Sequence, residues 1–291
     1  MEWLNTLVQG LLLGGLYAML ATGLSLVFGV MRLINLAHGD LGLVAAFIAF
    51  VIVSATPLGP FLSLIVVVPL MMVLGYLLQR TILNRTLEGG PLSSVLVTFG
   101  LAVILQNALL TAFTADSRGL DVGALETASL TITDRLIVGW LPLLTMATAV
   151  GMLVVLQTML DRTRLGRALR AAADDAEAAR MVGIDNRHLF GLAMAIALGT
   201  VAVGGVFLGI RTTFAPADGP ALLIFAYEAV IIGGLGSLWG TLAGAIILGM
   251  SQTVGGQISP AFQILAGHLV FLAILLIRPE GLFPRRSARQ A

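Results

Sequence analysis

Long apolar runs recur from one end of the sequence to the other, and they restrict the fold more than any other feature. Of the 291 residues, 58% are hydrophobic and only 11% are charged. About 20 apolar residues suffice to cross a bilayer as a helix, and lipid offers no partner to backbone groups outside helices and closed barrels. We therefore predict an all-α polytopic membrane protein with eight to nine transmembrane segments in a single domain, residues 1–291. The runs are 7–27, 41–53, 61–78, 92–113, 141–160, 189–210, 221–235, 241–254 and 262–277.

Residue types that several other functions require are missing. The chain has no cysteine, which excludes disulfides, thiol catalysis and zinc–thiolate sites. All 16 basic residues are arginine, so the lysine of a phosphate-binding P-loop is absent. The three histidines, at 38, 188 and 268, lie in different segments, and no catalytic motif is present. We therefore expect no catalytic residue, no cofactor, no metal site and, with a net charge of +1, no nucleic-acid partner.

The arginines cluster in stretches that fall on one side of the membrane when the nine runs are counted as crossings. Two lie in 80–85, six in 161–187 and four in 278–289, which is twelve of the 16. Cytoplasmic loops are enriched in basic residues. We therefore predict that this side is cytoplasmic, with the C-terminus inside and the N-terminus outside, and that loop 114–139 is external.

The charged loop 161–188 is unlike the rest of the chain. Residues 168–182 are rich in good helix formers, and Gly183 is a plausible C-terminal stop. We predict a short helix on which Ala176, Ala179 and Gly183 share a small-residue face. That face would suit docking of another protein, whereas a solvated loop that obeys the positive-inside rule explains the same residues. The residues alone leave both interpretations open.

Two polar breaks marked by glycine interrupt the apolar runs. Irregular backbone at membrane depth is tolerated only where protein covers it or where it lines a cavity, so we expect both breaks to line a translocation path or its gates. The alternatives are helix-end caps for the polar residues and close packing for the glycines. The first break, 34–40, carries Asn35, His38, Gly39 and Asp40, and the second, 233–240, carries Gly233, Gly234, Gly236 and Ser237.

A weak internal similarity links the two breaks. Segments 39–48 and 236–246 each consist of a glycine-marked break and a short apolar run. Transporters built from two related halves place their path at such broken helices. Chance similarity in a chain rich in glycine, alanine and leucine explains the likeness equally well. Segment 211–220, with two prolines and Gly219, is expected to be an ordinary turn.

Glu228 and His268 are ionisable residues embedded in the apolar runs. Such residues are costly in lipid and are paired or functional. One interpretation pairs Glu228 with an arginine or amide of a neighbouring span, and another gives it contact with a transported solute. An ion- or proton-coupled secondary transporter of a small solute would need such groups, so this class is the alternative function. The charged loop 161–188 would have no role in it.

Four motifs, in order over nearly the whole chain, resemble those of the LivH-type permeases of branched-chain amino acid ABC transporters. They are Ile34-Asn-Leu-Ala-His-Gly-Asp40, Gly166-Arg-Ala-Leu-Arg170 with Gly183-Ile184, Val230-Ile-Ile-Gly-Gly-Leu-Gly-Ser237, and Arg278-Pro-Glu-Gly-Leu-Phe283. Glu177-Ala178-Ala179 followed by Gly183 is also similar to the E-A-A-x-x-x-G signature of ABC importer permeases. The Leu-Pro that usually follows this signature is absent after Phe190.

The resemblance implies a permease domain over residues 1–291 in a bacterial inner membrane, without an ATPase site of its own. It implies a second permease subunit, two cytoplasmic ATPase subunits and an external solute-binding protein as partners. Arg170, Glu177, Ala178, Ala179 and Gly183 would couple this chain to the ATPase, and the two breaks would form the path. The implied cargo is a branched-chain amino acid or a related small amino acid or amide. Glu228 stands where the family pattern leads us to expect a small or apolar residue, which leaves the substrate open.

Overall fold

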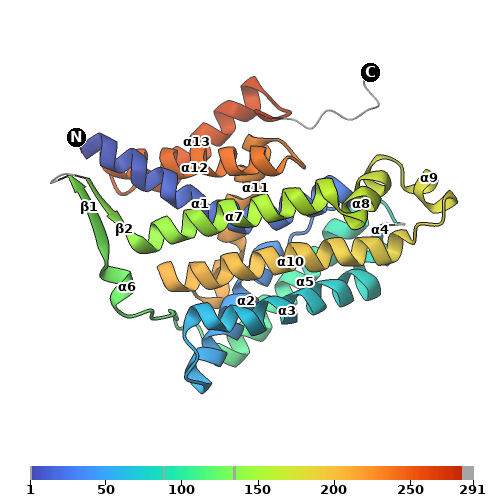
Figure 1. Ribbon diagram of the computed structural model, residues 1–291, viewed down its shortest axis with the longest axis horizontal. Coiled ribbons are helices and arrows are strands. Elements are labelled where there is room, and N and C mark those ends of the chain that lie inside the picture. Colours follow the sequence, from blue (N-terminus) through green and yellow to red (C-terminus); the bar gives the residue numbers. More distant parts are fainter. Residues whose placement is uncertain (1, 88, 134–135, 284–291) are drawn as a thin grey trace.

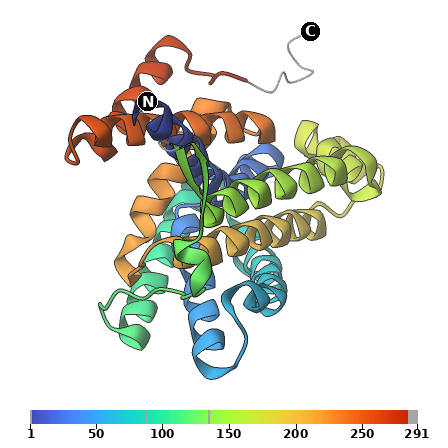
Figure 2. The ribbon, with the colours of Figure 1, turned by 60° about the vertical axis from the view of Figure 1, so that its left-hand side comes forward.

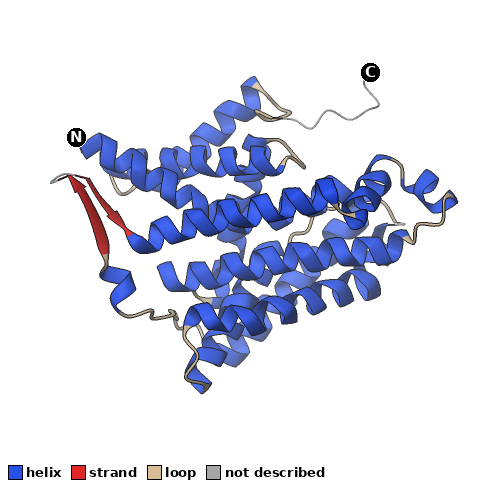
Figure 3. Ribbon diagram, in the orientation of Figure 1, coloured by secondary structure: helices blue, strands red, loops and turns tan. Residues whose placement is uncertain are grey.

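A computed structural model describes residues 2–87, 89–133 and 136–283 (Figure 1). Helices make up almost all of it (Figure 3), which confirms the predicted all-α membrane fold. Within the described residues, eight helices are long and apolar enough to cross a membrane, and the apolar α13 is shorter. The eight spans contain α1 (Glu2–Met31), α2 (His38–Ala55), α3 (Pro60–Leu78), α5 (Pro91–Phe113), α7 (Trp140–Arg162), α10 (Asn186–Arg211), α11 (Gly219–Gly233) and α12 (Leu238–Ile258), and the shorter helix is α13 (Phe262–Ile277).

Short elements mark the two ends of the bundle (Figure 1). One end, called here the α9 end, carries the π-helical turn η1 (Gln79–Leu83), α4 (Asn84–Leu87), α8 (Arg164–Asp174) and α9 (Ala176–Met181). The other, called the hairpin end, carries the N-terminus, α6 (Ala124–Thr127) and the antiparallel strands β1 (Ser129–Thr133) and β2 (Leu136–Gly139). The predicted loop 114–139 is thus partly ordered into a helix and a hairpin. Arg285, Arg286 and Arg289 of the predicted basic tail lie outside the described residues.

Helices α1 and α10 form the centre of the bundle (Figure 1, Figure 2). Their most apolar stretches are 83% and 89% buried, whereas that of α5 is 17% buried. Gly14 of α1 lies against α12, and a Cβ at this position would be 2.6 Å from the Cα of Ile246. Gly249 of α12 lies equally close to Gly10. Small residues therefore let α1 and α12 approach closely, which is the usual way helices associate in lipid.

The first predicted break is an irregular segment buried inside the bundle. Arg32 reverses the chain after α1 with a φ of +52°, and residues 33–37 run back along that helix. His38 Nε2 then lies 2.8 Å from the carbonyl oxygen of Leu20, so α2 starts about three turns short of the end of α1. The hydroxyl of Thr98 on α5 accepts a bond from the N–H of Leu36 (3.1 Å). Protein groups therefore take the place of water along this segment.

A second buried break lies between α10 and α11, where the sequence predicted an ordinary turn. Phe214 is only 1% exposed, and its N–H and carbonyl pair with the backbone of Arg118 at 2.8 and 2.9 Å. The 3-10 turn η2 (Pro216–Asp218) follows and leads into α11. The predicted turn is present, but it is buried and not an ordinary exposed turn, because proline, aspartate and glycine mark a reversal of the chain without showing its depth.

The two buried breaks meet where α2 and α11 begin. A Cβ on Gly39 would lie 2.1 Å from the carbonyl oxygen of Gly219, and a Cβ on Gly219 would overlap the carboxylate of Asp40. Only glycine at both positions allows the two helix starts to cross at this distance. Gly39, predicted as a gate residue, therefore has a definite packing role.

Two halves of opposite orientation result from these breaks. α1 runs from the hairpin end to the α9 end and α10 runs the other way (Figure 1). α1 packs against α12, α10 packs against α3, and α2 packs against α11. The arrangement supports a two-half repeat in which α2 of one half corresponds to α11 of the other. Segment 39–48 lies in α2 but segment 236–246 begins α12, so these two segments do not correspond. That short likeness reflects glycine at two helix starts and not equivalent positions.

The predicted break at 233–240 is a tight turn between α11 and α12 at the α9 end. Gly234 and Gly236 have φ values of +103° and +79°, a region that suits glycine alone. The N–H groups of Leu282 and Phe283 donate to the carbonyls of Ile232 (2.9 Å) and Gly233 (3.0 Å). The end of the described chain therefore closes over the C-terminus of α11.

We expect Gly14→Leu to destabilise the isolated chain by more than the ~1–3 kcal/mol typical of an overpacked core, because the clash is with backbone that cannot move aside. Gly151→Leu on α7 is the matched control, since a Cβ there meets nothing within 4 Å. Thermal unfolding in detergent and yield in membranes measure the difference. Equal unfolding temperatures for the two variants would contradict the close α1–α12 contact.

Candidate functional site

The charged loop 161–188 folds into two helices, where the sequence predicted one helix over 168–182. Asp175 separates them, and its Oδ1 accepts bonds from the N–H groups of Glu177 and Ala178, both at 3.0 Å. Thr163 caps α8 in the same way by accepting from the N–H of Gly166 (3.0 Å). A short acidic side chain competes for backbone N–H groups and favours a cap over a helix interior. This explains a new helix start among good helix formers.

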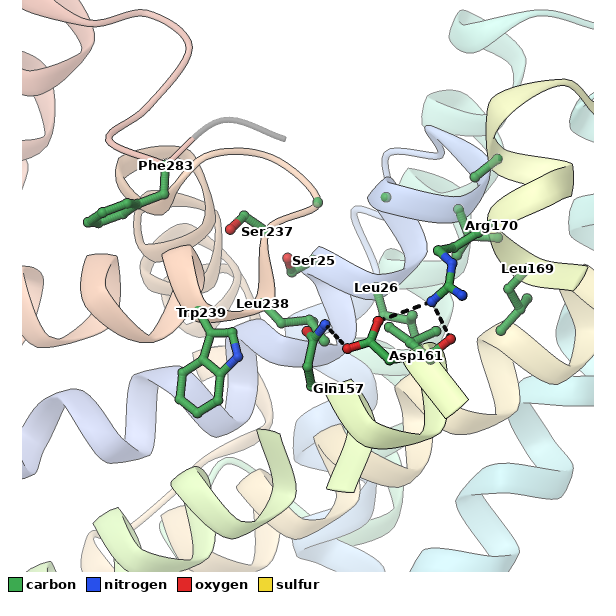
Figure 4. A pocket seen from close by; sticks show the side chains of 15 residues that line it. Ser25, Leu26, Gln157, Asp161, Leu169, Arg170, Ser237, Leu238, Trp239 and Phe283 are labelled. Atoms are coloured by element: carbon green, nitrogen blue, oxygen red, sulfur yellow. Dashed lines mark hydrogen bonds and ion pairs between the residues drawn. The ribbon is translucent and has the colours of Figure 1, made fainter. Parts of the chain in front are cut away.

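Arg170 fastens α8 to the end of α7 (Figure 4). Its guanidinium donates to the carbonyl oxygen of Leu160 and to Oδ1 of Asp161 (3.1 Å). Gln157 donates to the other oxygen of Asp161 (2.8 Å). The last carbonyls of a helix have no partner within it, so Arg170 satisfies one that α7 leaves open. The residue predicted to contact the ATPase therefore has a role within its own chain.

The start of α10 holds α9 in place. The side-chain amide of Asn186 donates to the carbonyl of Ala176 (2.5 Å). Asp185 caps α10 by accepting from the N–H of His188 (3.1 Å), and this bond lowers the pKa of the Asp185 carboxyl below its usual range. The hydroxyl of Tyr76 on α3 lies 2.8 Å from Nδ1 of His188. The α8–α9 element is therefore joined to α7 and α10, and the start of α10 is joined to α3.

The predicted contact face of α9 is wrong at its centre. Ala179 is only 4% exposed, because the turn that follows folds back and the N–H of Ile184 donates to its carbonyl (3.1 Å). Glu177, Ala178 and Gly183 are exposed, and Gly183 ends the helix with a φ of +89°.

Two large apolar side chains stand out at the tip of this element. Met181 is 79% exposed and Val182 is 77% exposed. Met181 is the last residue of α9 and Val182 follows it, and α9 lies beyond the ends of the long helices (Figure 1). Apolar side chains in so exposed a position are typical of a surface that another protein covers.

A cavity of about 350 Å³ lies beside the Arg170 anchor (Figure 4). It brings Arg170 of the charged loop together with Gly236 and Ser237 of the second predicted break, residues that no sequence pattern connects. Ser237 caps α12 by accepting from the N–H of Gly240 (3.1 Å). The remaining lining residues come from α1 (Ser25, Leu26, Gly29, Val30), the end of α7 (Gln157, Leu160, Asp161), α8 (Leu169, Ala173), the start of α12 (Leu238, Trp239) and the C-terminal segment (Phe283).

The residues of the first break lie apart from this cavity. Asn35, His38 and Asp40 are 0%, 2% and 1% exposed. Asn35 Oδ1 accepts from the N–H of Ala37 (3.1 Å), a bond within the irregular segment that precedes α2, and no side chain caps the start of α2. Among the described residues, no partner is found for Asn35 Nδ2, His38 Nδ1 and Asp40 Oδ1, and such buried polar atoms are uncommon.

Glu228 lies at a third place, between α11 and α13. It is 4% exposed, and its Oε1 accepts from Nδ1 of His268 at 2.5 Å. The expected structural partner is present, but it is a histidine and not an arginine or amide. Nearby, the hydroxyl of Tyr17 donates to Oε1 of Gln252 (2.5 Å). Neither Tyr17 nor Gln252 was expected as a site residue, although Gln252 is an amide within the apolar run 241–254.

Lining residues of the cavity were also missed by the sequence analysis, notably Asp161, Trp239 and Phe283. No local pattern connects them, because they come from the end of α7, the start of α12 and the C-terminal segment. Within residues 2–87, 89–133 and 136–283, no three His, Asp or Glu side chains are grouped as a metal site would require.

Comparison with known proteins gives a consistent result. Residues 6–278 match the model of a protein family described as branched-chain amino acid transport system, permease component. The chain is 26% identical to the high-affinity branched-chain amino acid transport system permease protein BraD of Pseudomonas aeruginosa, over 98% of this chain and 96% of BraD. It is 26% identical to LivH of Escherichia coli K12, over 97% of this chain and 96% of LivH. LivM of the same organism is 29% identical over 52% of this chain and 35% of LivM. No solved structure matches the chain.

We expect Arg170→Gln to lower the free energy of local opening of α8 by about 1 kcal/mol, which is the contribution of a partly exposed hydrogen-bonded ion pair. Amide hydrogen exchange across 164–173 should then be roughly fivefold faster, because local opening controls the rate. Arg167→Gln on the same helix is the control, since its side chain is exposed and reaches only the carbonyl of Arg162 at 3.4 Å. Identical exchange in the two variants would show that Arg170 does not hold α8.

Proposed function

The chain belongs to the family of branched-chain amino acid transport permease components, and on this premise we propose that it is the membrane-spanning permease subunit of a binding-protein-dependent ABC importer. Its cargo would be a branched-chain amino acid or a related small amino acid or amide. The observation that carries the proposal is the family match over residues 6–278, which includes both predicted breaks and the charged loop. ATP hydrolysis would belong to partner subunits, since the chain lacks the lysine of a P-loop.

The proposed partners are a second permease, two ATPase subunits and an external solute-binding protein. Support for the second permease comes from the similarity to both LivH and LivM, two permease proteins of one E. coli transport system. The two subunits of such a pair would each contribute one wall of the path.

The proposed orientation puts the α9 end in the cytoplasm and the hairpin end outside, in a bacterial inner membrane. Arg80, Arg85 and four of the six arginines of 161–187 belong to the short elements of the α9 end, and the other two, Arg162 and Arg187, are at the adjoining ends of α7 and α10. Cytoplasmic loops are enriched in arginine and lysine, so this asymmetry supports the proposed orientation. The external hairpin end would then receive the solute-binding protein.

The proposed docking surface for the ATPase is the exposed tip of the α8–α9 element. Met181 and Val182 supply its apolar centre, and Glu177, Ala178 and Gly183 supply its exposed flank. Ala179 is buried behind this surface, and its carbonyl accepts the bond from Ile184 that holds the turn after α9. Apolar side chains at the centre of an interface carry most of its energy, whereas charges at the rim mainly tune association.

The cavity suggests how movement of the docked loop would reach the path. Arg170 and Leu169 on one wall face Gly236 and Ser237 on another. A displacement of α8 would therefore change the space beside the α11–α12 turn. α11 in turn starts against α2 at the contact of Gly219 with Gly39, so both predicted breaks would respond to it.

We expect Val182→Asp to abolish co-purification of the ATPase subunits, because a charge would be buried without a partner at the centre of the interface. Leu130→Asp is the control, since Leu130 is an exposed apolar residue on the hairpin, at the other end of the bundle. Membrane yield should be unchanged for both variants. Full ATPase retention by Val182→Asp would refute this docking surface.

The function itself is tested by reconstitution in liposomes. We expect the chain with its partner subunits to accumulate a branched-chain amino acid against its gradient only when ATP and loaded binding protein are supplied. The chain alone should neither hydrolyse ATP nor accumulate solute. Accumulation by the lone chain in response to a proton or sodium gradient would support the secondary transporter instead.

A further inference from the structure

Polar side chains from four helices gather between α1, α11, α12 and α13. The Tyr17–Gln252 and Glu228–His268 hydrogen bonds form two pairs. The ring of Phe225 joins them, since its centroid lies 5.3 Å from that of Tyr17 and 6.3 Å from that of His268. Four polar groups placed together inside an apolar bundle are costly and mark functional positions in membrane proteins.

Each pair contains a buried atom that is left without a partner. Among the described residues, Glu228 Oε2 and Gln252 Nε2 have no hydrogen-bond partner, although the residues are only 4% and 1% exposed. The first is a carboxyl oxygen, which can accept a bond, and the second is an amide nitrogen, which can donate one. The cluster can therefore still take up an ammonium group at Glu228 and a carboxylate or carbonyl oxygen at Gln252. A zwitterionic amino acid carries both kinds of group.

One side of the cluster reaches the lateral surface of the chain, at α13. The side chain of His268 is 40% exposed, and α13 lies at the edge of the bundle in both views (Figure 1, Figure 2). Lipid cannot hydrogen-bond an imidazole, and ionisable side chains in membrane helices almost always face protein or a water-filled cavity. The face of α13 that carries His268 is therefore expected to border water or protein.

We propose that this face of α11 and α13 lines the water-filled translocation path, and that Glu228, reached past His268, binds the ammonium group of the amino acid in transit. The inference rests on the proposed function and assigns a chemical role to one residue within it. His268 is the positioning residue, because its bond to one carboxylate oxygen directs the other. In the alternative, the Glu228–His268 hydrogen bond only holds α11 against α13, and Glu228 never contacts the solute.

The test uses the complete importer with cysteine-free partners and thiol reagents that react only in water. Leu272→Cys lies one turn from His268 on the same face of α13 and leaves the pair intact. Val155→Cys on α7 is the control, since Val155 is also exposed (69%, against 49% for Leu272) but lies in an apolar helix surface. Rates are measured with 2-aminoethyl methanethiosulfonate, a cation, and 2-sulfonatoethyl methanethiosulfonate, an anion.

We expect Leu272→Cys to react at least about tenfold faster than Val155→Cys, and to prefer the cationic reagent. Adding Glu228→Gln should lower the cation-to-anion ratio about tenfold, in line with the focusing effect of a charge in a low-dielectric cleft. Adding Glu228→Asp should keep the preference. The same Glu228→Gln change should lower the maximal uptake rate while the concentration of loaded binding protein that gives half-maximal uptake stays the same.

Two outcomes would overturn the inference. If Leu272→Cys is as unreactive as Val155→Cys, the face does not border water. If it reacts but the charge preference is the same with Glu228→Gln, the path holds no ammonium site at Glu228. In both cases ATP-driven uptake by the unmodified importer would leave the proposed function standing, whereas absence of that uptake would refute the function itself.

Discussion

A chain surrounded by lipid must pair every backbone N–H and carbonyl from within, and the rest of this structure depends on how two irregular segments meet that requirement. Residues 32–37 lie beside α1, where Thr98 and Asn35 supply hydrogen bonds that water would otherwise provide. Residues 212–218 lie beside the backbone of Arg118. α5 bonds to the first segment through Thr98 and, with α2, packs against the second, so both segments are stable at a depth where an exposed loop would not be.

The two irregular segments also determine where short helices can start inside the bundle. α2 and α11 both begin at depth, and they meet where Gly39 lies against the carbonyl of Gly219 and the carboxylate of Asp40 lies against Gly219. A side chain at either glycine would separate the two helix starts. Gly14 of α1 allows an equally close approach to α12.

The proposed coupling between the docking surface and the translocation path depends on how α8 contacts α7 and the α11–α12 turn at the α9 end. Arg170 ties α8 to the last carbonyls of α7, so α8 follows α7 as a unit. The cavity then separates α8 from the α11–α12 turn by a gap and not by packed side chains. The gap leaves room for α8 to move toward or away from this turn, which a close-packed interface would not allow.

The sequence by itself determined the membrane fold, the number of spans, the family and the special character of the loop 161–188, because hydropathy, charge and short motifs are properties of neighbouring residues. It also located the breaks at 34–40 and 233–240 from their glycines. Only the tertiary structure decided that 212–218 is buried, that α2 corresponds to α11, that Ala179 faces inward and that Arg170 shares a cavity with Ser237. Each of these depends on contacts between residues far apart in the chain. A glycine or a proline shows that the backbone turns, but the depth of the turn depends on which helices surround it.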